Sequence, residues 1–599
     1  MHTFDVFTDD CRAHAGSTTA IDACNRAIAA AAGADRPLLV LLGDVVPSAE
    51  AVGLLLEAIE SDPMIGFATP RLSTSDGNSI ARLDFGGDAS IEDLPRRVLC
   101  ELPETYLVAD APARCMLIKP VVLTNFGELD RRFRTLAAAL WHYMARARRC
   151  GFRTLVCNRA VVSFAEAHGV RVSSSITLGG LPESDRILLR ELLPDIDSTR
   201  RHFGTGREAA TETRLARALP DAYGSRRSLL IDVRNVIPGM NGTAIAALGV
   251  CGGLHAIAVD WDVTLLAAKD GCAFHQLETL FPSWYVSTNL PDRQFTVALR
   301  LSQPWHMQEM IDLHSAAAFN VYMFLDTISW DIAYTAPGHL DGTWSFLADH
   351  ADGILFISEF TRDRFVRRFP SAARTPGFVS HLSFDPADYI HPFAERCSGE
   401  DVIFVVGNEY DHKDVPSTVE LLTTAFPYQQ IVALGSAKAT TPRVTVLQSG
   451  AISDLDIHRL YAGSRVVVFP SFYEGFGLPI LTALAYGRTV IARKSALLDE
   501  IAVHCAPRGE LVPFVDREEL VELIGRVLYG RPLPSLQLGA AVRHGRPLSW
   551  QDIAENMMRF ITNLMSDLSG SRWRTREHTI QQLMAAPVSL TQTGVRVPR

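Results

Sequence analysis

The sequence predicts an α/β protein with two Rossmann-like domains of the doubly wound type, preceded by a third α/β region. Its 599 residues are enough for about four folded units, and 47% hydrophobic with 21% charged residues is the composition of a globular protein. Short apolar runs alternate with helical patterns, which is typical of parallel strands covered on both faces. Length, composition and this alternation together give the fold class.

The first region, residues 1–180, mixes strand and helix patterns. Its apolar runs are Phe4–Phe7, Leu38–Leu42 and Leu155–Val156, with a helical stretch between the first two. Residues 181–225 are rich in both charges and lack long strands, so they predict a helical linker.

Two consecutive series of strand-like runs follow, one within residues 226–395 and one within 396–565. The first contains Leu229–Ile231, Ile257–Val259, Phe295–Val297, Val321–Leu325 and Ile354–Ile357. The second contains Val402–Val406, Ile431–Leu434, Val444–Val446, Val466–Phe469 and Val490–Ile491. Each series predicts one Rossmann-like domain. Residues 566–599 are basic and predict a flexible tail.

Charge and cysteine content exclude several classes of protein. A net charge of -10 gives no reason to expect nucleic acid or anionic lipid as the main partner. The ten cysteines form no CxxC pair and no Cys/His cluster at zinc spacing, so we expect neither disulfides nor a structural metal. No run of about 18 uncharged apolar residues occurs. We therefore expect a cytoplasmic protein, with peripheral membrane contact left open.

A loop after the run Val466–Phe469 carries the most informative motif. It contains Glu474, Gly475 and Gly477 and precedes an apolar helical run, an arrangement that presents backbone N–H groups and a helix N-terminus to an anion. The glycines would let a phosphate approach the main chain, and Glu474 could accept hydrogen bonds from sugar hydroxyls. The alternative is a turn whose glycines only satisfy backbone geometry.

A second loop follows the run Val402–Val406 and contains Gly407, Asn408 and Lys413. Ligands of such domains lie at the carboxyl ends of the strands, and a lysine there can balance a diphosphate. Only five of the 57 basic residues are lysines, which weighs against the alternative of an ordinary solvated surface lysine. Together, the two loops predict a diphosphate site.

Residues 226–565 resemble the family-four retaining glycosyltransferases, which have the GT-B fold. The resemblance is strongest from Gly407 to Glu500, and it rests on Ser464–Pro479, His412-Lys413 and Gly487–Ile491. It implies that Glu474 contacts the donor sugar, and that Lys413 neutralises the leaving diphosphate. It also implies that backbone amides of the loop Gly475, Phe476, Gly477 and Leu478 hold the phosphate.

Two positions depart from the family pattern. The second glutamate of the family motif falls on Thr482, which offers a hydroxyl but no carboxylate to the nucleotide ribose. The family's phosphate-binding arginine is replaced by Asn408, a donor without charge, which leaves Lys413 as the main cation. The resemblance therefore implies a donor site with a changed nucleotide contact.

The first Rossmann-like domain supplies four further candidates. Gly242 and Thr243 lie in a glycine-rich loop that resembles the family loop facing the cleft, and His306 and Asp326 follow in positions that could also face it. The alternatives are a packed histidine beside Trp305 and an aspartate that caps a helix.

The N-terminal region resembles a truncated GT-A domain of the family-two glycosyltransferases. Only Asp44 remains of that family's acidic metal-nucleotide motif, and the acidic pair expected later is replaced around Ala137–Leu140. The resemblance therefore implies a degenerate, inactive domain, and Asp44 is better explained as a strand-end cap.

The function implied is transfer of a hexose from a nucleotide-diphosphate sugar, with retention, to a saccharide or lipid-linked acceptor in bacterial cell-surface polysaccharide synthesis. No metal or other cofactor is required for it. The alternative is a catalytically inactive scaffold or sugar-binding subunit, favoured by Thr482 and Asn408. A nicotinamide oxidoreductase is disfavoured because neither Rossmann-like domain opens with GxGxxG. The oligomeric state is not predicted.

Overall fold

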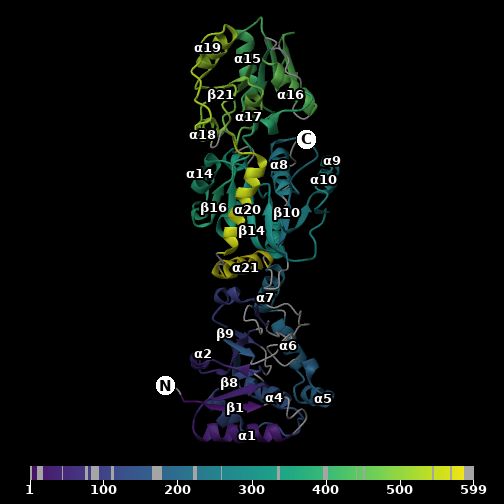
Figure 1. Ribbon diagram of the computed structural model, residues 1–599, viewed down its shortest axis with the longest axis vertical. Coiled ribbons are helices and arrows are strands. Elements are labelled where there is room, and N and C mark those ends of the chain that lie inside the picture. The colour runs from purple at the N-terminus through teal and green to yellow at the C-terminus, as the bar shows by residue number, and fades with distance from the viewer. Residues whose placement is uncertain are drawn as a thin grey trace. The chain divides into compact units, whose positions relative to one another are not determined.

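The chain forms two compact units, each described by itself. Unit 1 comprises residues 1–227 and 568–599, and unit 2 comprises residues 228–567. The computed structural model (Figure 1) describes residues 3–9, 18–43, 45–73, 79–81, 94–108, 113–164, 178–204, 206–219, 226–257, 260–332, 338–394, 402–439, 441–448, 452–542, 546–566 and 570–585.

Unit 1 is built on a mixed sheet in the order β1-β2-β8-β4-β9-β3, with β7 paired to β9. The pairs β1/β2 and β4/β9 are parallel, whereas β8 runs antiparallel to both β2 and β4. The strands are β1 (Asp5–Asp9), β2 (Leu38–Leu42), β3 (Val45–Val46), β4 (Ile65–Leu72), β7 (Thr105–Val108), β8 (Cys115–Ile118) and β9 (Arg153–Phe164); β5 (Ser79–Ile80) pairs with β6 (Leu94–Pro95).

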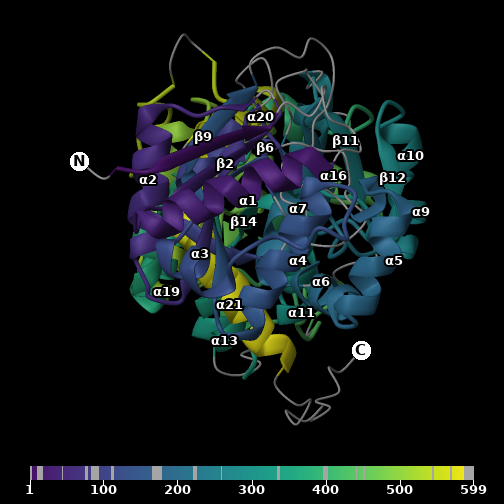
Figure 2. The same ribbon diagram turned by 90° about the horizontal axis from the view of Figure 1, so that it is seen from below.

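Helices cover both faces of this sheet because β2 is apolar at every position. Successive side chains of a strand point to opposite faces. Leu38, Val40 and Leu42 accordingly pack with α1 and α4, whereas Leu39 and Leu41 pack with α2. Figure 2 shows α1 running along β2. The helices are α1 (Thr18–Gly33), α2 (Ala49–Glu60), α3 (Pro120–Phe126) and α4 (Leu136–Arg149).

The region predicted as a linker is helical but belongs to the core of unit 1, so that prediction is corrected. It contains α5 (Glu183–Leu192), α6 (Ile196–Gly204) and α7 (Arg207–Ala218). Leu189 and Leu193 are buried in the same core as α1 and α4. In α7, Glu212 forms a fully buried ion pair with Arg71 of β4. These apolar and ionic contacts fix the helices against the sheet.

The predicted flexible tail is also corrected within the described residues. Helix α21 (Gly570–Ala585) belongs to unit 1, where it packs beside the 3-10 helix η1 (Arg96–Glu101), and its Ile580 is 3% exposed. The apolar residues of this basic segment were too few to predict a buried face. Residues 567–569 and 586–599 lie outside the described residues.

Unit 2 begins with a parallel sheet in the order β12-β11-β10-β13-β14-β15-β16, which confirms the doubly wound prediction. We call residues 228–394 together with 546–566 the first lobe. Its strands are β10 (Ser228–Asp232), β11 (Asp262–Leu266), β12 (Tyr285–Ser287), β13 (Phe295–Arg300), β14 (Ala317–Phe324), β15 (Gly353–Phe356) and β16 (Gly377–Val379). Its helices are α8 (Gly242–Ala256), α9 (Lys269–His275), α10 (Leu277–Leu280), α11 (Met307–Ala316), α12 (Ile328–Asp331), α13 (Leu340–His350), α14 (Glu359–Arg368) and α20 (Trp550–Ser566).

One predicted strand of the first lobe is wrong. Ile257 caps the C-terminus of α8 instead of opening a strand, and the strand β11 lies at Asp262–Leu266. Helix α8 is so rich in small apolar residues that its end resembles a strand in sequence. Residues 258 and 259 lie outside the described residues.

A second parallel sheet, in the order β19-β18-β17-β20-β21-β22, forms the second lobe, residues 402–542. Its strands are β17 (Val402–Val406), β18 (Gln430–Leu434), β19 (Val444–Leu447), β20 (Val466–Phe469), β21 (Thr489–Arg493) and β22 (Glu510–Phe514). Its helices are α15 (Val415–Ala425), α16 (Asp454–Gly463), α17 (Leu478–Ala485), α18 (Ala496–His504) and α19 (Arg517–Leu528). In both sheets the strand order reverses beside the first strand, at β10/β13 and at β17/β20.

Helix α20 returns to the first lobe, so the predicted second domain, 396–565, is corrected at its end. Figure 1 shows α20 beside α8. A Cβ atom on Gly249 of α8 would lie 2.3 Å from Trp550 Cε2, so this close packing requires glycine. Before α20, Leu548 O accepts hydrogen bonds from the Phe384 and Asp385 N–H groups.

Candidate active site

The two predicted loops meet where the strand order of the second lobe reverses. Lys413 ends the 3-10 helix η5 (Asp411–Lys413) after β17, and Glu474 follows the neighbouring strand β20. Lys413 Nζ lies 2.6 Å from Glu474 Oε1, and the two side chains are only 14% and 16% exposed. Ligands of open α/β sheets bind at such reversal points. The fold therefore places an ammonium and a carboxylate together at the expected ligand site.

The backbone holds the two loops together independently of this ion pair. The Phe472 N–H donates to His412 O at 2.8 Å, and the Gly407 N–H anchors the start of its loop by donating to Leu434 O at 3.0 Å. Arg493, at the end of β21, pairs with Asp414 directly after Lys413 at 2.8 Å. The residues on either side of Lys413 are thus held by contacts from the segment after β20 and from the end of β21.

The glycine-bearing loop leads into α17, as the sequence predicted. Gly477 adopts φ of 88° at the N-cap of α17, a left-handed conformation that favours glycine. Phe476 is buried with its ring 5.2 Å from that of Phe384 in the first lobe. The Thr482 hydroxyl donates to Leu478 O at 3.1 Å. The N-terminus of α17 is therefore the end of the helix nearest Glu474.

Gly475 joins the loop to the first lobe. A Cβ atom on Gly475 would lie 2.3 Å from Leu325 O and 2.9 Å from Asp326 Cβ. The Gly475 carbonyl accepts hydrogen bonds from Ser358 Oγ at 2.8 Å and Thr361 Oγ1 at 3.2 Å. We call the loop between β20 and α17, residues 470–477, the donor loop. The absence of a side chain on Gly475 and these two hydrogen bonds bring it directly against the first lobe.

For the sugar transfer that the family resemblance implies, we expect Gly475→Ala to reduce the rate by at least about 100-fold, because the added methyl group must displace the loop from the carbonyl of Leu325. Initial rates of transfer over a range of donor concentrations test this expectation. Gly463→Ala is the matched control, since a Cβ atom there has nothing within 4 Å. Unchanged activity in Gly475→Ala would show that the close approach has no role in positioning the loop.

Asp326 from the first lobe also reaches this site. It follows β14, its Oδ1 accepts a hydrogen bond from the Ile328 N–H at 2.9 Å, and its backbone N–H donates to Gln303 Oε1 at 3.1 Å. Burial, helped by the nearby charge of Glu474, raises the pKa of Asp326 to about 6 against the lowering effects of the Ile328 N–H, Lys413 and Gln303. The structure therefore brings Asp326 into electrostatic contact with both Lys413 and Glu474.

The raised pKa of Asp326 predicts how stability depends on pH. A carboxyl group with a pKa above its unfolded value stabilises the fold at low pH, and this contribution is lost as the pH rises through the folded value, here about 6. We expect the melting temperature of the wild type to fall relative to that of Asp326→Asn as the pH rises from about 4 to about 7. Thermal unfolding at closely spaced pH values measures it, and an unchanged slope contradicts it. Asp341→Asn, an exposed control in the same lobe, should leave the slope as in the wild type.

The sequence did not predict the hydrogen-bond network that holds Tyr473 beside Glu474. The Tyr473 hydroxyl lies 2.6 Å from Thr327 Oγ1 and donates to Asp331 Oδ2 at 2.8 Å. Arg368 in turn donates to Asp331 Oδ1 through Nε at 2.6 Å. Only the position of Tyr473, immediately before Glu474, could have suggested a role, because its partners lie in the first lobe.

Glu500 makes a further contact between the lobes. Its carboxylate accepts hydrogen bonds from the Glu359 and Phe360 N–H groups at the start of α14, at 2.6 and 3.1 Å, and lies 2.8 Å from His381 Nε2. Burial alone would raise the pKa of Glu500, but His381 and the two N–H groups outweigh it and hold the pKa below its usual value. The carboxylate is thus a helix cap supplied by the other lobe.

Comparison with known proteins identifies part of this architecture. Residues 398–537 match the family model Glycosyl transferases group 1. The match contains both Lys413 and Glu474. Residues 398–537, which include nearly all of the second lobe, therefore form a glycosyltransferase group 1 domain.

Relatives of known name share this segment. An MMP alpha-(1->4)-mannosyltransferase from Mycolicibacterium hassiacum is 36% identical over 110 residues, 18% of this chain and 26% of that protein. A D-inositol 3-phosphate glycosyltransferase from Mycobacteroides abscessus is 29% identical over 174 residues, 29% of this chain and 35% of that protein. The chain thus spans about a quarter to a third of the length of these relatives.

The crystal structure of HepE from Anabaena, in complex with UDP and glucose, is similar over 56% of this chain and 100% of that chain. The sequence identity is 16% and the TM-score is 0.44.

The remaining candidates lie at different distances from the ion pair. Gly242 reaches the donor loop, because a Cβ atom on it would lie 3.7 Å from Leu478 Cδ1, and Thr243 follows it in α8. His306 is exposed and stacks on His339 with ring centroids 5.4 Å apart, so the described contacts do not join it to Glu474.

Asn408 Oδ1 accepts a hydrogen bond from the Tyr410 N–H at 3.1 Å. Asp44 lies outside the described residues.

Within the described residues, no group of three or more His, Cys, Asp or Glu side chains is arranged to hold a metal ion. No helix in the described part of the chain combines the length and apolar character needed to cross a membrane.

Proposed function

We propose that unit 2 is a retaining glycosyltransferase of the family-four type, with the GT-B fold. In this proposal it transfers a hexose from a nucleotide-diphosphate sugar to a saccharide or lipid-linked acceptor, in bacterial cell-surface polysaccharide synthesis. The name of the mannosyltransferase relative agrees with hexose transfer. The observation that carries the proposal is the 2.6 Å pair of Lys413 and Glu474 beside the N-terminus of α17.

The pair suits the donor because each member has a separate task. Lys413 and the N-terminus of α17 favour the negative charge that develops on the leaving diphosphate. Glu474 accepts hydrogen bonds from hydroxyl groups of the hexose. In the proposal, donor binding replaces Glu474 with the diphosphate as the partner of Lys413, which frees the carboxylate for the sugar.

The transfer step needs no group beyond these and the acceptor. The bond between the anomeric carbon and the diphosphate oxygen breaks, and its electron pair stays on the diphosphate. The acceptor hydroxyl attacks the anomeric carbon from the same face, and its proton passes to the leaving oxygen. Asp326, which is buried and interacts electrostatically with Lys413, contributes to the charge balance around it.

A panel of UDP-, GDP-, ADP- and dTDP-sugars tests the proposal. We expect one of them to raise the melting temperature saturably and to be hydrolysed slowly in the absence of an acceptor. Lys413→Met should remove both effects, whereas Lys438→Met, an exposed lysine of the same lobe, should preserve them. If no donor gives either effect with the wild-type protein, unit 2 is not an enzyme of this class.

The alternative of an inactive scaffold or sugar-binding subunit rests on Thr482 and Asn408. The Thr482 hydroxyl donates to the helix backbone, and the Asn408 oxygen accepts from its own loop. A saturable rise in melting temperature without hydrolysis or transfer would favour this alternative.

A further inference from the structure

Three large apolar side chains stand exposed around the loop that joins β10 to α8. Ile237 and Met240 lie in this loop and are 56% and 54% exposed, and Phe274 lies in α9 and is 54% exposed. We call these three residues the apolar rim. Leu280 of α10 and Tyr285 of β12 are also exposed, at 52% and 64%. Exposed apolar side chains carried on adjoining segments are characteristic of a binding surface.

The rim is a fixed part of the first lobe. His275 Nε2 lies 3.0 Å from Ile237 O, which ties the loop to α9. A Cβ atom on Gly271 would lie 2.2 Å from Val236 O, so α9 packs directly against the loop backbone. The three side chains are thus carried on two segments in direct contact.

The rim is continuous with the candidate active site. Directly after Met240, the Asn241 side chain caps α8 by accepting a hydrogen bond from the Ala244 N–H at 2.9 Å. The next residue, Gly242, approaches Leu478 at the start of α17. An acceptor whose reactive end reaches the donor loop would therefore have its remote end beside the rim.

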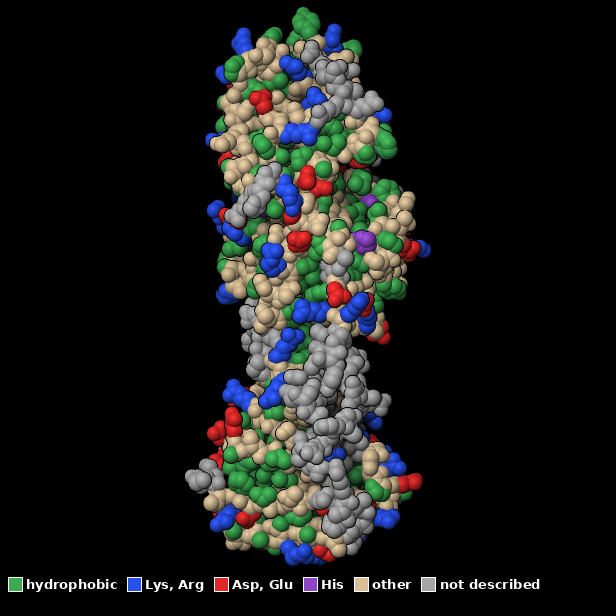
Figure 3. All heavy atoms as spheres, viewed as in Figure 1, with side chains coloured by type: hydrophobic (Ala, Val, Ile, Leu, Met, Phe, Trp, Pro, Cys, Tyr) green, Lys and Arg blue, Asp and Glu red, His purple; other side chains and the backbone are tan. Residues whose placement is uncertain are grey.

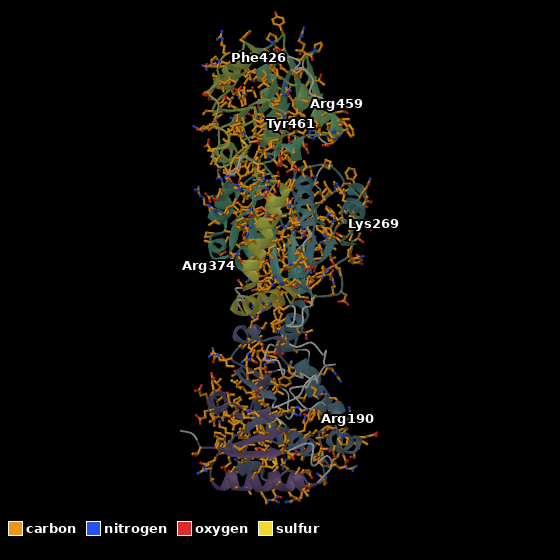
Figure 4. All side chains as sticks on the ribbon, in the orientation of Figure 1. Arg190, Lys269, Arg374, Phe426, Arg459 and Tyr461 are labelled. Atoms are coloured by element: carbon orange, nitrogen blue, oxygen red, sulfur yellow. The ribbon has the colours of Figure 1, made fainter. Side chains whose placement is uncertain are left out.

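The charge around the rim does not favour an anionic membrane surface. Helices α9 and α10 carry Lys269, Asp270 and Glu278, so cations do not outnumber anions. Lys269, labelled in Figure 4, lies at the outer edge of the lobe. In Figure 3, apolar side chains lie around the histidine side chains visible on the side of the lobe where Figure 1 labels α8, α9 and α10. A single apolar chain fits these observations better than a lipid headgroup surface.

We propose that the apolar rim binds the hydrocarbon chain of an amphiphilic acceptor, a sugar that carries an alkyl or polyprenyl chain, while its sugar end reaches the donor loop. The inference rests on the proposed function and selects the lipid-linked class of acceptor. Each methylene group that the rim removes from water strengthens binding by about fourfold. Partial burial of an eight-carbon chain is therefore enough for a large preference.

The test compares methyl and octyl α-mannosides and α-glucosides as acceptors for the full chain, with octyl glycosides kept below their micelle concentration. We expect the wild-type KM to be at least about tenfold lower for the octyl glycoside. The double variant Ile237→Ser/Phe274→Ser should lose this preference and keep the KM of the methyl glycoside. Met240→Ser should lose part of it, and Tyr428→Ser, an 82% exposed tyrosine of the second lobe, should lose none.

Donor hydrolysis without acceptor separates the two proposals. If the wild type hydrolyses the donor but has equal KM values for methyl and octyl glycosides, the rim proposal is wrong and the proposed function stands. If Ile237→Ser/Phe274→Ser keeps the octyl preference but loses sedimentation with phosphatidylcholine vesicles, the rim binds a membrane instead, which also overturns the proposal. Equal melting temperatures of variant and wild type exclude misfolding as the cause.

Discussion

Glu474→Gln should lower kcat/KM for sugar transfer by at least about 100-fold while the melting temperature stays close to that of the wild type. Glutamine retains the size of the side chain but cannot form the ion pair with Lys413 or accept hydrogen bonds at two oxygens. Because the backbone bond from Phe472 to His412 also holds the loops, we expect the site to keep its shape. Steady-state kinetics and thermal unfolding on the same preparations measure both quantities.

The matched control is Glu409→Gln, which removes the same charge from an exposed residue in the loop after β17. It should leave kcat/KM within about twofold of the wild type. If Glu474→Gln turns over as fast as Glu409→Gln, Glu474 has no role in transfer, and the assignment of the ion pair as a donor site fails.

The largest effect on stability is expected in unit 1, where Arg71→Met should destabilise the fold by about 3–5 kcal/mol. Arg71 and Glu212 are both fully buried, and Arg71 Nε also donates to Asn158 Oδ1 at 2.7 Å. Removal of the guanidinium leaves a carboxylate without its counter-ion in the core. Hydrogen exchange of the full chain should show faster exchange in β4 and α7.

The strands β17 and β20 of unit 2 provide the internal control for that measurement, since their exchange should not change. The double variant Arg71→Met/Glu212→Leu should recover most of the loss, because no charge then remains buried. A single variant with unchanged exchange would show that Glu212 finds another partner or reaches solvent.

The location of Lys413 and Glu474 at a ligand site could be predicted because each lies in a local sequence pattern, a loop directly after a strand. A strand, a glycine-bearing loop and a helix N-terminus follow one another within a short segment, and the reversal of strand order brings two such segments together. The same logic failed at Ile257, where an apolar helix end has the composition of a strand.

The contacts of Gly475 with Leu325 and of Tyr473 with Asp331 could not be predicted, because they join residues more than one hundred positions apart. Nothing in the sequence around Tyr473 distinguishes a half-buried, hydrogen-bonded tyrosine from an exposed one. The packing of α7 in the core of unit 1 could not be predicted for the same reason. One of its charged residues, Glu212, is paired in the core, and its partner Arg71 lies in the distant strand β4.

The return of α20 to the first lobe has a consequence for biosynthesis. Trp550 covers Gly249, yet the ribosome makes Trp550 only after it has made the whole second lobe. During translation the small-residue surface of α8 therefore stays exposed until α20 has been made. The second lobe can fold earlier, as soon as its own strands emerge. Unit 1 is completed later still, because it needs α21. Synthesis of unit 1 therefore begins before that of unit 2 but ends after it.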